Sequence, residues 1–113
     1  MKITKIKVYQ LGLPLKEISY KWSHNNEVKE FDNTIIKLET DSNVFGVGEV
    51  CTLGSAYLPA YARGVRSGIE EIGKSLIGLD PSNITNINTV MDANLKGHSY
   101  IKSPIDMACW DIM

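Results

Sequence analysis

The sequence has neither a long apolar run nor an excess of charge of one sign. Twelve Lys and Arg residues stand against thirteen Asp and Glu residues, which gives a formal net charge of -1. Such a balance, without a basic cluster, is not typical of proteins that bind nucleic acid or anionic membranes. No window approaches the roughly 20 apolar residues of a membrane-spanning helix, and residues 1–7 alternate charged with apolar side chains, unlike a signal peptide. We therefore expect neither nucleic acid nor a membrane as a partner.

Cysteine is scarce as well. The two cysteines, Cys51 and Cys109, lie far apart and in unlike surroundings, so the sequence does not have the cysteine pattern of a disulfide-stabilised secreted domain. We expect both to be small buried side chains in a protein of the reducing cytoplasm.

The side chains that usually carry catalysis do not form a recognisable set. His24 and His98 are far apart, and neither has a second ligand at metal-binding spacing. The pair Glu70-Glu71 is best explained as part of a solvated helix face. Because no nucleophile, base and acid can be assembled, we predict no catalytic residue and no metal site within this chain.

A glycine pair at Gly46 and Gly48 invites a nucleotide-binding interpretation. The dinucleotide fingerprint needs a third glycine three residues later, and Cys51 occupies that position. Glycines inside a strand also allow a neighbouring backbone or a ligand to approach closely. We prefer this second explanation, and we expect Glu49 beside the pair to be structural.

Hydrophobic alternation predicts three strands in the first half of the chain, over Ile3–Leu13, Thr34–Thr40 and Val44–Cys51. Pro14 closes the first strand because proline cannot donate to a ladder. Residues 41–43, Asp-Ser-Asn, supply a turn that tolerates left-handed geometry. The strands therefore form an antiparallel meander, and the polar, aperiodic residues 15–30 are predicted to be a loop.

A helical period replaces the alternation in the second half. One amphipathic helix is predicted from apolar residues spaced by three and four, and Gly64 and Gly68 within it suggest a close approach to the sheet. A second helix is predicted over Ile84–Leu95. The apolar stripe of the first helix comprises Leu58, Tyr61, Val65, Ile69, Ile72 and Leu76.

A third helix is predicted to begin at Ser103, because serine caps helices and Pro104 suits a first helical position. Its apolar stripe runs through Ile105, Ala108, Cys109 and Ile112, with no stop signal before Met113. We expect this stripe to pack on something outside the chain, so that the chain is a fragment. The fold class is α+β, a three-stranded antiparallel meander followed by helices.

The sequence contains four motifs in order: residues 1–6, residues 46–49 (Gly-Val-Gly-Glu), Leu79-Asp80-Pro81 and residues 103–112. Together they resemble the mandelate racemase and muconate lactonizing group of the enolase superfamily. The residues 46–49, Gly-Val-Gly-Glu, resemble its "G-x-G-E" strand, and residues 103–112, Ser-Pro-Ile-Asp-Met-Ala-Cys-Trp-Asp-Ile, resemble its "A-x-D-x-A-x-W-D" helix. The opening residues 1–6 resemble its first strand, and Leu79-Asp80-Pro81 its "G-x-D-P" turn. Together these motifs cover almost all of the chain.

The resemblance implies a domain organisation and a chemistry. Residues 1–100 would form the capping domain, and 101–113 would begin the helix that leads into an absent modified TIM barrel. In this group a barrel lysine removes the proton α to a carboxylate, and Mg2+ held by barrel acids supplies the positive charge that this weakly acidic proton requires. The fragment alone would be inactive, and the parent would be a racemase, epimerase or dehydratase, and a homo-oligomer.

Two aromatic segments carry a more specific resemblance. Residues 20–23, Tyr-Lys-Trp-Ser, and residues 54–59, Gly-Ser-Ala-Tyr-Leu-Pro, are similar to those of hydroxyproline-betaine 2-epimerases and cis-3-hydroxy-L-proline dehydratases. The resemblance implies that Tyr20, Trp22 and Tyr57 bind a small carboxylate substrate of the amino-acid or betaine type. The alternative is a free-standing α+β binding module without catalysis, whose last helix would expose its apolar stripe to a partner.

Overall fold

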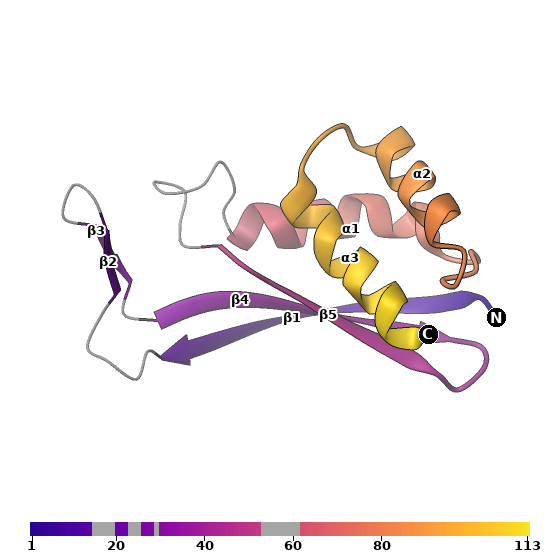
Figure 1. Cartoon of the computed structure of the whole chain (residues 1–113), viewed down its shortest axis with the longest axis horizontal. Coiled ribbons are helices and arrows are strands. Elements are labelled where there is room, and N and C mark those ends of the chain that lie inside the picture. The colour runs from indigo at the N-terminus through magenta and orange to yellow at the C-terminus, as the bar shows by residue number, and fades with distance from the viewer. Residues whose placement is uncertain (15–19, 23–25, 29, 53–61) are drawn as a thin grey trace.

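The computed structural model describes residues 1–14, 20–22, 26–28, 30–52 and 62–113. Side chains are described for those of these residues that lie outside the range 12–31. Three long antiparallel strands form a sheet in the order β1-β4-β5, and a separate pair of short strands, β2 and β3, lies beyond one of its ends (Figure 1). The three helices of the described residues cover one face of the large sheet (Figure 1). The elements are β1 (Ile3–Pro14), β2 (Tyr20–Trp22), β3 (Asn26–Val28), β4 (Glu30–Thr40), β5 (Phe45–Cys51), α1 (Ala62–Leu76), α2 (Ile84–Asn94) and α3 (Ser99–Ile112).

The predicted meander is confirmed, and its strands are longer than expected at one end. β4 begins at Glu30 rather than Thr34, so the β1–β4 ladder runs as far as the pair Pro14 and Glu30. The prediction of a loop over residues 15–30 is wrong where β2 and β3 pair, with Tyr20 opposite Val28. Strands of three residues are too short to display the alternation by which strands are recognised.

The β4–β5 turn is built as its residues predict. Asn43 has a φ of 58°, the left-handed conformation that asparagine tolerates. The Asp41 carboxylate accepts a hydrogen bond from the Lys2 backbone at 2.9 Å, and the Thr40 hydroxyl donates to the Val44 carbonyl at 2.6 Å. The turn therefore also ties down the start of β1.

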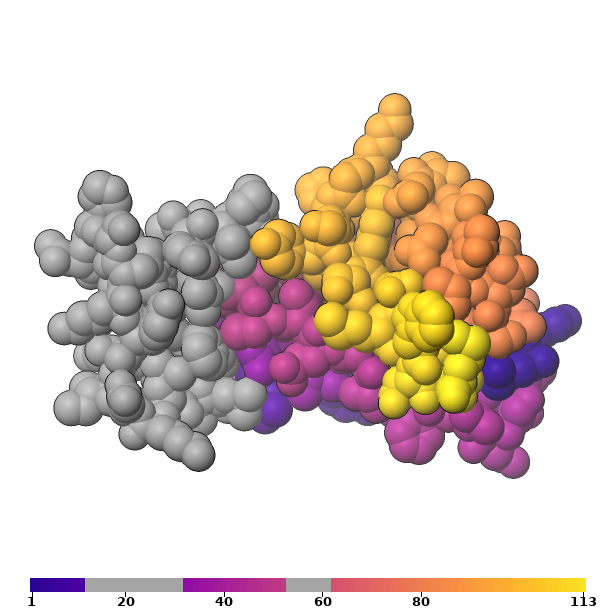
Figure 2. Space-filling view, viewed as in Figure 1, coloured from indigo at the N-terminus to yellow at the C-terminus, as the bar shows by residue number. Residues whose placement is uncertain are grey.

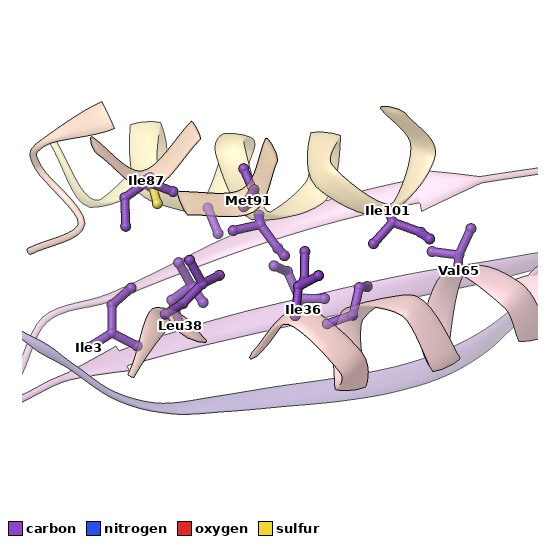
Figure 3. Close-up of a cluster of buried hydrophobic side chains, with 13 residues drawn as sticks. Ile3, Ile36, Leu38, Val65, Ile87, Met91 and Ile101 are labelled. Atoms are coloured by element: carbon purple, nitrogen blue, oxygen red, sulfur yellow. The ribbon is translucent and has the colours of Figure 1, made fainter. Parts of the chain in front are cut away.

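An apolar core of described residues lies between the sheet and the helices (Figure 3). Ile36 and Leu38 of β4 point into it because alternate strand residues share a face. The predicted stripe of α1 supplies Val65, Ile69, Ile72 and Leu76, and α2 supplies Ile87 and Met91. The stripe's first two members, Leu58 and Tyr61, lie outside the described residues.

The glycine pair of β5 lets α3 lie directly on the strand. A Cβ atom at Gly46 would clash with the Ala108 carbonyl oxygen, and one at Gly48 would clash with the Pro104 carbonyl oxygen. Four helix residues rise about 6 Å and two strand residues span about 6.6 Å, so both contacts repeat in register. The end of α3 (yellow) rests on the magenta strands in Figure 2. The close-approach explanation of these glycines is confirmed.

The predicted start of the last helix is wrong. α3 begins at Ser99, after His98, whose φ is 55°, and Pro104 lies inside the helix. Buried Ile101 accounts for the extension, because its side chain fills the space left at Gly68 of α1. The glycine at position 68 therefore accommodates α3 and not the sheet, which corrects the expected contact.

The apolar stripe of α3 also has a different partner from the one expected. Ile105, Ala108 and Cys109 are buried in this chain's own core, with Ile112 packed against it. The exposed apolar side chains of this helix are instead Met107 and Trp110. Among the described helices, α1–α3, none has the length and apolarity needed to cross a membrane.

Candidate functional site

The predicted site residues belong to segments that join the sheet at one end, where β1 stops and β4 begins. The backbones of Tyr20 and Trp22 belong to β2, just beyond this end (Figure 1). Their side chains, and the whole of Tyr57, lie outside the described residues. The described part of the site therefore consists of the residues that flank these segments.

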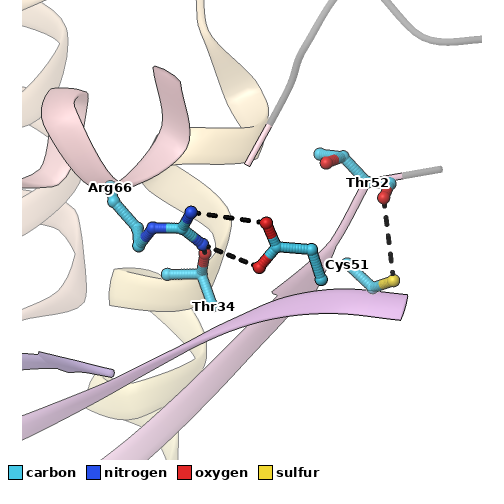
Figure 4. Close-up of polar contacts among 5 residues, drawn as sticks. Thr34, Cys51, Thr52 and Arg66 are labelled. Carbon is cyan, nitrogen blue, oxygen red and sulfur yellow. Dashed lines mark hydrogen bonds and ion pairs between the residues drawn. The ribbon is translucent and has the colours of Figure 1, made fainter. Parts of the chain in front are cut away.

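A side-chain cluster joins α1 to β4 at this end (Figure 4). The Arg66 guanidinium donates to both carboxylate oxygens of Asp32, at 3.0 and 3.4 Å, and to the Thr34 hydroxyl at 3.2 Å. The Arg66 side chain is 19% exposed and that of Asp32 is 44% exposed. A two-point guanidinium–carboxylate pair fixes orientation as well as distance. The cluster therefore sets how the start of α1 sits on the sheet.

Asn33 and Cys51 lie opposite each other beside this cluster, on neighbouring strands. Asn33 is 3% exposed, and its Oδ1 has no hydrogen-bond partner among the described residues. Burial raises the pKa of the half-buried Cys51 thiol, and the nearby charges of Glu49 and Asp32 raise it further. Cys51 is thus a neutral thiol at physiological pH and not an activated nucleophile.

The second cysteine is more strongly insulated. Burial, with a smaller contribution from Asp106, raises the pKa of the Cys109 thiol to about 12. Both cysteines are free, so the expectation of unpaired thiols is confirmed, with Cys51 less buried than predicted. Neither supplies a thiolate for catalysis.

Those of the remaining candidates that the structure describes do not meet at a common point. Glu70 and Glu71 are exposed on α1, which confirms the solvated-face interpretation, and His98 is exposed at the start of α3. His24 lies outside the described residues. In the part of the chain that the structure describes, no three His, Cys, Asp or Glu side chains are grouped so that they could hold a metal ion.

Sequence reasoning missed Arg66 and Asp32. They are far apart along the chain, and no local motif links them. The available signal was the place of Arg66 directly after Val65 on the apolar side of an amphipathic helix, where a charged side chain needs a partner. The cluster joins the start of α1 to the start of β4.

Comparison with known proteins agrees with this architecture. Residues 14–113 match the family model of the mandelate racemase / muconate lactonizing enzyme N-terminal domain. The chain is 58% identical, over its full length, to cis-3-hydroxy-L-proline dehydratase from Roseibium aggregatum, and 33% identical to N-succinyl-L-Arg/Lys racemase from Bacillus cereus. It spans 31% and 30% of these two relatives.

Solved structures show the same fold. A putative mandelate racemase/muconate lactonizing enzyme from Roseovarius nubinhibens, complexed with magnesium, matches with a TM-score of 0.95 at 37% identity, over 99% of this chain and 30% of that one. The N-succinyl Arg/Lys racemase structure from Bacillus cereus matches with a TM-score of 0.92 at 32% identity, over 100% of this chain and 30% of that one. Fold, motifs and identity agree, and the chain belongs to the mandelate racemase and muconate lactonizing enzyme family, whose N-terminal domain it matches.

Proposed function

We propose that this chain covers the substrate site of a full-length racemase, epimerase or dehydratase that removes the proton α to the carboxylate of a proline or betaine derivative. The observation that carries the proposal is the 58% identity, along the whole chain, to a cis-3-hydroxy-L-proline dehydratase. A relative that differs in reaction, the N-succinyl-L-Arg/Lys racemase, also acts on an amino-acid derivative. The two relatives differ in reaction but both act on amino-acid derivatives, which supports the proposed substrate class.

Magnesium would belong to the parent protein and not to the described residues of this domain. A solved relative is complexed with magnesium, whereas the described residues of this chain provide no cluster of ligands. When bound, the ion would supply the positive charge that makes an α-proton of a carboxylate removable. The contribution of this chain would be to enclose the substrate and exclude water.

The residues proposed for substrate contact are Tyr20, Trp22 and Tyr57. Aromatic rings provide an apolar wall, and their faces attract the ammonium group of a proline or betaine by about 0.5–2 kcal/mol. The architecture supports this assignment, because Tyr20 and Trp22 lie on β2 beyond the end of the sheet. Thr52, the last described residue before Tyr57, follows the end of β5.

The proposed partners are the barrel domain of the same polypeptide and further copies of the full-length protein, in the cytoplasm. Residues 1–100 would form the cap proper, and residues 101–113, which include most of α3, would lead towards the barrel. The alternative of a free-standing binding module loses its main support, because the apolar stripe assigned to a partner is buried against this chain's own sheet.

A chimera tests the proposal. This chain would replace the matching N-terminal segment of the Roseibium aggregatum enzyme, 31% of its length. We expect the chimera to dehydrate cis-3-hydroxy-L-proline, and to lose activity when magnesium is removed with EDTA and regain it on re-addition. A folded chimera that turned over neither cis-3-hydroxy-L-proline nor hydroxyproline betaine would contradict the proposal.

In the active chimera, we expect Tyr57→Ala to raise KM for the proline-type substrate at least several-fold, because a wall of the substrate pocket is removed. The matched control is Tyr9→Ala, which removes an exposed tyrosine from β1. Steady-state kinetics on both variants decides the point. Equal KM values in the two variants would remove Tyr57 from the site.

A further inference from the structure

We propose that Arg66 and Asp32 are positioning residues for substrate binding. Their ion pair fixes the start of β4 relative to the start of α1. β4 follows the segment that carries Tyr20 and Trp22, and α1 follows the segment that carries Tyr57. This inference rests on the function proposed above and adds two residues that do not themselves touch the substrate.

The positions of the pair along the chain carry the first step. Asp32 follows the first described residue of β4, Glu30, by two residues, and Glu30 is paired with Pro14 across the ladder. The chain between Pro14 and Glu30 contains β2, with Tyr20 and Trp22. The carboxylate of Asp32 is therefore attached to the strand that receives this segment.

Arg66 has the equivalent place on the other segment. It lies four residues after Ala62, the first residue of α1, which is about one helical turn. Residues 53–61, including Tyr57, connect Thr52 at the end of β5 to this turn. One guanidinium thus links the entry of α1 to the entry of β4.

The geometry of the link carries the second step. Arg66 donates to both oxygens of Asp32 and to the hydroxyl of Thr34, which is buried. Three hydrogen bonds from one planar group restrain rotation as well as separation, which an ammonium group on a flexible stem does not do. The starts of β4 and α1 are therefore held in one orientation relative to each other.

The size of the expected effect follows from how sensitive binding sites are to position. A displacement of about 1 Å, transmitted from a distance, can reduce catalytic efficiency about 100-fold. Because the affected groups would be pocket walls that contact substrate before and during reaction, the loss should occur mainly in KM. A residue that only stabilised the fold would lower the unfolding midpoint and leave KM unchanged.

The experiment uses the chimera with three single variants and with the Asp32→Asn/Arg66→Lys double variant. Asp32→Asn removes the charge, Arg66→Lys keeps the charge but loses the planar fork, and Asp92→Asn is the matched control. Asp92 pairs with Lys102 at 2.7 Å and joins α2 to α3. Each variant is measured for KM, kcat and urea unfolding midpoint, and for amide exchange over residues 30–34 and 62–66.

We expect Asp32→Asn and Arg66→Lys each to raise KM about ten-fold with kcat changed less than three-fold. The double variant should be no worse than either single one, because both remove the same link. Amide exchange over 30–34 and 62–66 should accelerate in these variants and not in Asp92→Asn. Unchanged KM, or an equal rise in the control, would overturn the inference while leaving the proposed function intact.

Failure of the proposed function itself has a different signature. In that case the unsubstituted chimera is folded but inactive. The amide-exchange measurement then still tests the link, and exchange equal to that of Asp92→Asn would overturn it.

Discussion

Two regions of this domain are held together in opposite ways. Where α3 crosses β5, backbone meets backbone, and Gly46 and Gly48 leave no room for a Cβ atom. At the end of the sheet where β4 begins, a long side chain from α1 reaches across, and Arg66 makes the contact through Asp32 and Thr34. The first region defines the fold and tolerates no added atom. We expect the second to tolerate substitution with a smaller loss of stability, and we infer that its changes alter function.

The largest effect should come from filling the space at Gly48. Gly48→Ala places a methyl group against the Pro104 backbone, which cannot rotate away, so we expect a loss of about 3 kcal/mol in the free energy of unfolding. Urea unfolding of the domain measures it.

The matched control is Gly73→Ala in α1. The nearest atom to its added Cβ is Ile6 Cδ1 at 3.5 Å, an ordinary contact. Alanine is the better helix former, so this variant should gain about 0.5–1 kcal/mol. Equal and small effects of both substitutions would show that α3 is not pressed onto β5 as described.

A smaller effect should follow from Asp111→Ala. The Asp111 carboxylate accepts a hydrogen bond from the Val47 backbone at 2.9 Å and so pairs an N–H on the edge strand β5. Its removal should cost about 1 kcal/mol, typical of one hydrogen bond. Asp111→Asn, which keeps an acceptor oxygen, should recover part of this loss. An unfolding midpoint unchanged by Asp111→Ala would mean that the glycine contacts alone hold α3.

The smallest effect concerns pH and the β4–β5 turn. The hydrogen bond from the Lys2 backbone holds the pKa of Asp41 below its ordinary value of 3.8. A lowered pKa in the folded state stabilises the fold above that ordinary value, and the stabilisation is lost as the pH falls through the folded-state pKa. Asp41→Asn should therefore flatten the stability profile below about pH 4 and leave its shape at pH 5–7 unchanged. Thermal unfolding across this range tests it; a parallel shift at all pH values would exclude titration of Asp41 as the cause.

Much of the fold was predictable because the relevant signals are local. Alternation of apolar and polar residues located the three long strands, and Asp41-Ser42-Asn43 located the turn between β4 and β5. The helical spacing of Ile69, Ile72 and Leu76 located α1. The role of Gly46 and Gly48 followed from the meaning of glycine inside a strand.

The errors that concern α3 share a physical cause, which is competition from tertiary contacts. Ser103-Pro104 has the composition of a helix start, yet Ile101 packs at Gly68 and the helix begins earlier, with proline inside it. The stripe of Ile105 and Ala108 was correctly identified as apolar, but the sequence did not show that this chain's own β5 would cover it.

The candidate site was less predictable than the fold. Tyr20, Trp22 and Tyr57 came from a resemblance, because an aromatic side chain in a loop has no spacing rule that separates packing from binding. The Arg66–Asp32 pair depends on how two distant elements meet, and no pattern along the chain encodes that meeting directly.

The insulated thiol of Cys109 has a practical consequence. A neutral thiol inside the core, with a pKa of about 12, hardly reacts with alkylating reagents until the core opens. The rate at which a maleimide labels Cys109 would thus report how often α3 lifts from the sheet. Cys109 is thus a built-in probe for the opening of the helix–strand contact. Cys51→Ser would remove the other cysteine, so that all labelling would come from Cys109.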